Sequence, residues 1–147
     1  TVVATDLRGY GDSAKPIGEV DHRNYSKRML ARDQVKVMTH LGYAQFAVVG
    51  HDRGARVAHR MALDYPDRLS KLALLDIIPT AELYATFDQT LATAYYHWFF
   101  LIQPAPLPET LIGAKPKYYL KQCLERWSHD FSAFTPVALA EYQRCFQ

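Results

Sequence analysis

An aspartate stands at the centre of a glycine-flanked turn, Gly50-His51-Asp52-Arg53-Gly54. The apolar run 46–49 before the turn predicts a buried strand, and the amphipathic run 56–65 after it predicts a helix. Glycines two places either side of a central residue are typical of a sharp strand-to-helix turn that presents this residue as a nucleophile, and we expect only small residues to fit there. Because a carboxylate is anionic at neutral pH, Asp52 could attack a saturated carbon directly.

Two arginines fall in the first turn of the expected helix. Arg53 and Arg56 are three residues apart and therefore share a helix face. Cations in a first turn oppose the helix dipole, so this placement suggests a bound anion, and arginine forks suit a carboxylate. The structural alternative is that both arginines pair with surface carboxylates.

A second aspartate ends the next expected strand, residues 69–75. Asp76 would lie at the same carboxyl edge as Asp52, one strand over, and ligands of open α/β sheets bind at that edge. Its structural alternative is to cap the helix that follows.

The elements around these residues indicate an α/β protein with a parallel sheet and flanking helices. Strands are expected at 1–5, 46–49 and 69–75, and a helix at 27–41 that Ser26 would cap. The glycine-rich segment 6–13 reads as a structural loop at a strand end, pinned by contact between Asp6 and Arg8. From residue 79 the pattern turns wholly helical, with helices expected at the segments 82–102, 118–127 and 137–146.

Three segments together resemble the haloacetate (fluoroacetate) dehalogenases of the α/β-hydrolase superfamily: the run 50–60 (Gly-His-Asp-Arg-Gly-Ala-Arg-Val-Ala-His-Arg), the run 6–13 (Asp-Leu-Arg-Gly-Tyr-Gly-Asp-Ser) and the pair His97-Trp98. The resemblance implies a partial α/β-hydrolase core over residues 1–78 and the start of an inserted helical cap over residues 79–147. It implies a longer enzyme of which this chain is the central part.

The resemblance also implies roles for individual residues. Asp52 would be the nucleophile and Asp76 the acid that orients a catalytic histidine, although some relatives take this acid from a later strand. Arg53 and Arg56 would bind the substrate carboxylate, and His97 and Trp98 would bind the leaving halide. The histidine itself would follow the cap, so we expect the isolated 147-residue chain to be inactive.

The implied reaction is hydrolysis of haloacetate to glycolate and halide through an ester on Asp52, with no metal and no cofactor. An epoxide hydrolase or haloalkane dehalogenase is the alternative within the superfamily; these enzymes typically carry tryptophan where this chain has Arg53. A non-catalytic protein that binds a small carboxylate is a third possibility, and the intact Asp52 turn argues against it.

The composition limits which other classes of protein the chain could belong to. The chain has 147 residues, a hydrophobic fraction of 49% and a formal net charge of +2, which suits one core and gives no basic track for nucleic acid. No stretch is long and apolar enough to cross a membrane. Two cysteines, Cys123 and Cys145, have no metal-ligand spacing and suit a reducing cytoplasm. The expected partners are a small 2-haloacid, water and, as in members of the resembled family, a second copy in a homodimer.

Overall fold

The computed structural model describes residues 1–146. Backbone contacts divide the chain into two compact units, residues 1–86 and 87–147, of which the last residue, Gln147, lies outside the described part. The predicted division falls earlier, after residue 78, and the assignment of core and cap stays a prediction. None of the helices in residues 1–146 is long and apolar enough to cross a membrane.

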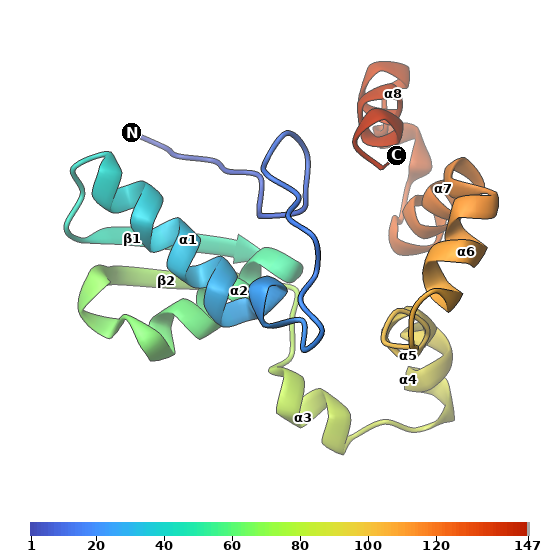
Figure 1. The fold of residues 1–147 in the computed structure, drawn as a ribbon, viewed down its shortest axis with the longest axis horizontal. Helices are drawn as coiled ribbons and strands as arrows, with labels where there is room; N and C mark the ends of the chain where they lie inside the picture. The colour runs from blue at the N-terminus through green and yellow to red at the C-terminus, as the bar shows by residue number, and fades with distance from the viewer. Residues whose placement is uncertain (147) are drawn as a thin grey trace. The chain divides into compact units, whose positions relative to one another are not determined.

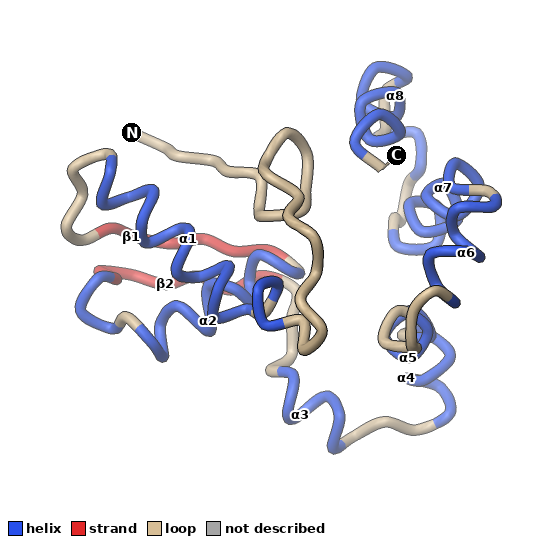
Figure 2. Tube along the Cα trace, viewed as in Figure 1, coloured by secondary structure: helices blue, strands red, loops and turns tan. Residues whose placement is uncertain are grey.

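Unit 1 is built on a parallel pair of strands, β1 (Phe46–His51) and β2 (Leu69–Leu75), with Val48 opposite Leu72. Figures 1 and 2 show the two strands side by side, with α1 (Lys27–His40) and α2 (Arg53–Asp64) packed against them. The short segments η1 (Arg23–Tyr25) and η2 (Pro66–Arg68) precede α1 and β2, and α3 (Thr80–Ala85) ends the unit. The parallel α/β architecture expected from the sequence is therefore confirmed.

The core of unit 1 lies between the two helices and one face of the sheet. Its buried residues are Leu30, Ala31, Val35, Val57 and Met61, which pack against the partly buried side chains of strand residues such as Phe46, Val48 and Leu69. Alternate residues of a strand point to opposite faces, so Val49 points away from this core and is 71% exposed. This packing fixes the end of β1 against the start of α2.

The expected strand at residues 1–5 is absent. The segment has no strand geometry in the structure, and its residues are exposed. A strand of a parallel sheet requires a neighbour that completes its hydrogen-bond ladder, and in the described chain β1 pairs with β2 alone. An apolar, β-branched composition was therefore not enough to predict pairing.

The chain from α3 onward is helical, as expected, but the single helix expected over residues 82–102 is broken. Instead of one helix over residues 82–102 the structure has α3, α4 (Gln89–Ala94) and α5 (Tyr96–Phe100). The Thr86 hydroxyl bonds to the Glu82 and Leu83 carbonyls and the Asp88 carboxylate accepts from the Leu91 N–H, so side chains end one helix and cap the next.

The remaining elements of unit 2 follow the proline-rich segment after residue 103: α6 (Leu107–Ala114), α7 (Pro116–Trp127), η3 (Phe131–Ala133) and α8 (Pro136–Cys145). The helices expected at 118–127 and 137–146 are confirmed to within two residues at either end, whereas α6 was not expected.

Candidate active site

Asp52 is the single residue between β1 and α2. Its backbone has φ 44° and ψ −114°, a conformation that is strained for a residue with a side chain. Its N–H donates to the Leu75 carbonyl at 3.3 Å, which ties the turn to the end of β2. The sharp strand-to-helix turn expected from the sequence is therefore present, and the exposed Asp52 carboxylate lies at the carboxyl edge of the sheet.

The two flanking glycines are not equivalent. A Cβ on Gly50 would lie 2.6 Å from the Gly54 carbonyl oxygen and 2.7 Å from the Ala55 Cα, so a side chain cannot be accommodated there. A Cβ on Gly54 would have no heavy atom within 4 Å among the described residues. The expectation that both positions need small residues holds at Gly50 and is wrong at Gly54 for this structure.

The two arginines of the first turn of α2 have different partners. The Arg53 guanidinium carbon lies 5.9 Å from the centre of the Tyr10 ring, a cation–π distance. Arg56 donates from Nη1 to the Ile78 carbonyl at 3.0 Å and to the Thr80 hydroxyl at 3.1 Å. Arg56 therefore also anchors the segment that leads into α3.

Lys27 and Tyr10 both interact electrostatically with the charged groups at the start of α2. The pKa of Lys27, in the first turn of α1, is lowered to about 8, first by partial burial and then by the positive charges of Arg53 and Arg56, while Asp52 opposes the shift. Partial burial also raises the pKa of Tyr10, with Arg53 lowering it and Asp52 raising it. Three cations and one carboxylate thus share a small region, which is the electrostatic setting for an anionic ligand.

Asp76 follows β2 directly and also has a positive φ, 57°. Its carboxylate is 3.6 Å from Nε2 of His51, beyond hydrogen-bond length, and both side chains are largely exposed. The N-cap residue of α3 is Pro79, and no side chain caps the helix, so Asp76 does not have that role. Asp76 is thus placed at the same sheet edge as Asp52, and its role as the orienting acid stays a prediction.

His97 and Trp98 lie on α5, in unit 2, within an aromatic cluster. The His97 ring is 4.6 Å from the Trp127 ring and 6.0 Å from the Tyr95 ring, and Trp98 meets Tyr95 edge-on at 5.8 Å. Asp52 and the arginines belong to unit 1. The halide-binding role of the pair therefore stays a prediction.

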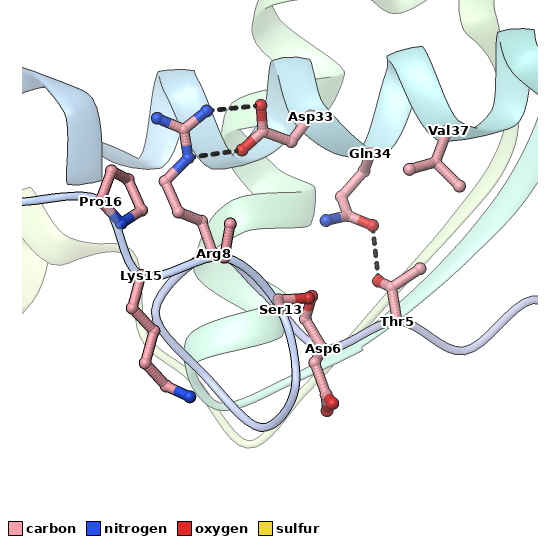
Figure 3. A pocket seen from close by; sticks show the side chains of 10 residues that line it. Thr5, Asp6, Arg8, Ser13, Lys15, Pro16, Asp33, Gln34 and Val37 are labelled. Atoms are coloured by element: carbon pink, nitrogen blue, oxygen red, sulfur yellow. Dashed lines mark hydrogen bonds and ion pairs between the residues drawn. The ribbon is translucent and has the colours of Figure 1, made fainter. Parts of the chain in front are cut away.

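A hollow of about 810 Å³ in unit 1 is lined by residues of the loop before α1 and by α1 itself (Figure 3). Four of its polar side chains pair with one another: Arg8 forms two hydrogen bonds to Asp33, and Thr5 bonds to Gln34 at 2.6 Å. The expected contact between Arg8 and Asp6 is replaced by this Asp33 pair. None of the predicted catalytic residues lines this hollow.

Residues 1–146 contain no cluster of three or more His, Cys, Asp or Glu side chains that could hold a metal ion.

Sequence reasoning missed two neighbours of Arg53, namely Tyr10 and Lys27. Their own segments are recognisable, because Tyr10 lies in the glycine-rich loop 6–13 and Lys27 directly follows Ser26, whose hydroxyl caps α1. No sequence signal places either residue beside Arg53.

Comparison with known proteins identifies the family to which the chain belongs. The family model described as "alpha/beta hydrolase fold" matches residues 1–135. The chain belongs to the α/β-hydrolase family. It is 52% identical over 145 residues to fluoroacetate dehalogenase from Burkholderia sp., covering 98% of this chain and 48% of that protein. The resemblance stated from the sequence is thereby confirmed.

Other α/β hydrolases also match. The chain is 35% identical to soluble epoxide hydrolase from Corynebacterium sp. (strain C12), over 98% of this chain and 50% of that protein. A solved α/β-hydrolase structure from Nostoc sp. PCC 7120 superposes with a TM-score of 0.93 at 71% identity, over 96% of this chain and 48% of that one. The chain thus spans about half the length of the relatives it matches.

Proposed function

We propose that this chain carries the nucleophile and the carboxylate-binding site of a haloacetate dehalogenase, which converts fluoroacetate or chloroacetate to glycolate and halide. The observation that supports it most is the strained Asp52 turn surrounded by Arg53, Arg56 and Lys27. A carboxylate nucleophile suits a saturated carbon, and the surrounding cations suit an anionic substrate. The 52% identity to fluoroacetate dehalogenase supports the same reaction.

In the proposed first step an oxygen of Asp52 bonds to the carbon that carries the halogen. The carbon–halogen bond breaks, and the halide leaves with the electron pair. Arg53 and Arg56 hold the substrate carboxylate and offset its repulsion from Asp52. His97 and the Trp98 indole N–H are the proposed hydrogen-bond donors to the departing halide.

In the second step water adds to the ester carbonyl of Asp52, and cleavage of the bond between that carbonyl carbon and the ester oxygen releases glycolate. The Arg53 backbone N–H, at the free end of α2, is a proposed donor to the oxyanion. Asp76 would orient the histidine that takes the proton from water. A homodimer and a cytoplasmic location are part of the same proposal.

The second candidate is epoxide hydrolysis on the same Asp52. It is favoured by the 35% identity to the Corynebacterium soluble epoxide hydrolase. An epoxide is neutral, however, and gives the cations around Asp52 no partner. The substrate that reacts decides between the two candidates.

The deciding experiment measures halide released from fluoroacetate and chloroacetate by the full-length protein, defined as the product of the complete reading frame that encodes this chain. We expect release from both acids, and in Arg53→Ala a loss of about 100-fold in kcat/KM, the size expected when one partner of a charged contact is removed. Arg23→Ala, a change at an exposed arginine of η1, is the matched control and should retain full activity.

Absence of halide with both acids, together with diol formation from a styrene-type epoxide, would transfer the assignment to epoxide hydrolysis. Equal activity of Arg53→Ala and the unchanged protein would remove Arg53 from the substrate site.

A further inference from the structure

Three segments of unit 1 meet beside Asp52: the glycine-rich loop 6–13, the start of α1 and the start of α2. Gly9 lies against the ring of Tyr25, because a Cβ on Gly9 would come within 2.8 Å of the Tyr25 Cε1. The next residue in the loop, Tyr10, places its ring 5.9 Å from the Arg53 guanidinium carbon. The loop is therefore packed on one side against η1 and contacts α2 on the other.

Arg53 needs such a contact for a physical reason. Its neighbour in the chain is the Asp52 carboxylate, and a flexible guanidinium can fold back onto a carboxylate and form a charge-assisted hydrogen bond with it. Such a bond would occupy the nucleophile and the substrate-binding fork at the same time. In the part of the chain that the structure describes, Arg53 forms no ion pair, and its guanidinium lies over the Tyr10 ring instead.

We propose that Tyr10 is a positioning residue whose aromatic face holds the Arg53 guanidinium away from Asp52 and ready for the carboxylate of a short 2-haloacid. This inference rests on the proposed function and assigns a role to a residue that does not touch the reacting atoms. The aromatic face attracts the cation through its quadrupole, and the contact leaves the guanidinium N–H groups free to donate in the plane of the fork.

The surroundings of Tyr10 agree with this role. The pKa of its hydroxyl is raised by partial burial, lowered by Arg53 and raised by Asp52, so all three groups act on one another. The residue is 44% exposed, which leaves the pair open to an incoming ligand. The contact uses the ring and not the hydroxyl, so phenylalanine should replace tyrosine without loss.

The test compares Tyr10→Leu with Tyr10→Phe in the full-length protein. Halide release by the unchanged protein is measured first, since its absence would overturn the proposed function and not the positioning role. With an active protein, loss of a cation–π contact of this kind predicts a rise of about two- to five-fold in KM for chloroacetate in Tyr10→Leu. We expect kcat to stay within roughly two-fold, because a variant that loses only substrate binding raises KM and leaves kcat unchanged. Tyr10→Phe should match the unchanged protein.

A double-mutant cycle separates positioning from general destabilisation. Binding of acetate, which has the carboxylate and no leaving group, is measured by calorimetry in the protein that retains Asp52, because the proposed role is to keep Arg53 off that carboxylate. Tyr10→Leu should weaken binding when Arg53 is present and have no further effect in Arg53→Ala. Equal effects in both backgrounds, an unchanged KM, or failure of Tyr10→Phe to restore KM would each overturn the proposal; Tyr10→Met replaces Tyr10→Leu if the latter does not fold.

Discussion

At the scale of single residues, Lys27 shows that the region around Asp52 carries more positive charge than is favourable for folding alone. Its pKa of about 8, against an ordinary value of 10.5, results first from burial and then from Arg53 and Arg56. Between these two pH values the unfolded chain keeps the Lys27 proton and the folded chain has lost it. The stability of the protein should therefore rise through this window as the unfavourable charge disappears.

We predict that Lys27→Met in the full-length protein raises the melting temperature at pH 7 by about 2–4 °C, because it removes a charge that is costly to bury. The advantage over the unchanged protein should shrink as pH rises above about 8 and vanish only above the ordinary pKa of 10.5. Thermal melts at pH 7, 8.5 and 10 measure this difference. Lys36→Met, the same change at an exposed position of α1, is the control and should show no such trend; a pH-independent difference for Lys27→Met would contradict the argument.

The residues of the turn were predictable from the sequence because glycines two places either side of a central residue are typical of a sharp strand-to-helix turn. Gly50 has no room for a Cβ, and Asp52 has the strained backbone that the glycine-flanked motif implies. Tyr10 and Lys27 were not predictable as neighbours of Arg53. They are 43 and 26 positions away in the chain (53 − 10 and 53 − 27), and no local pattern encodes which loop or helix start will lie beside the turn.

At the scale of elements, Arg8 ties the loop before α1 to that helix and to η1 through three hydrogen bonds. Arg8 donates from Nε and Nη2 to both oxygens of Asp33, at 2.9 and 2.8 Å, and from Nη1 to the Asn24 carbonyl at 3.1 Å. Its side chain is 21% exposed and that of Asp33 is 26% exposed. A paired, partly buried fork of this kind fixes the loop that carries Tyr10.

We predict that Arg8→Ala lowers the free energy of unfolding by about 2–3 kcal/mol, because Asp33 is left partly buried without its partner. Arg23→Ala breaks the exposed Arg23–Asp21 pair instead and should cost less than about 0.5 kcal/mol. Urea unfolding of the full-length protein measures both variants. Similar costs for the two would mean that the loop is held by other contacts.

The elements themselves were predicted unevenly, for identifiable reasons. Where apolar periodicity and a cap agree, as at Ser26 before α1, the helix was found almost to the residue. Where a continuous helical pattern extended through aromatic residues, at 82–102, the side chains of Thr86 and Asp88 ended one helix and began the next. The segment 1–5 has strand composition without a strand, since pairing depends on a neighbour and not on composition.

At the scale of the whole chain, the two halves of the proposed reaction have different requirements. Attack on the substrate needs Asp52 and the cations beside it, all of which unit 1 supplies. Hydrolysis of the ester also needs a base to activate water. In the described residues the imidazole nearest Asp76 is that of His51, 3.6 Å away. His51 directly precedes the nucleophile in the chain, and the side chains of adjacent residues usually point in different directions.

We therefore predict that the 147-residue chain, expressed alone and incubated with chloroacetate, releases no more than one halide per chain. Any chain that reacts should carry a carboxymethyl ester on Asp52, which peptide mass spectrometry detects and which Asp52→Asn abolishes. Sustained halide release would contradict this prediction and would direct attention to His51 as the base. His51→Gln would then stop turnover while leaving the first halide, because ester formation does not use the base that activates water.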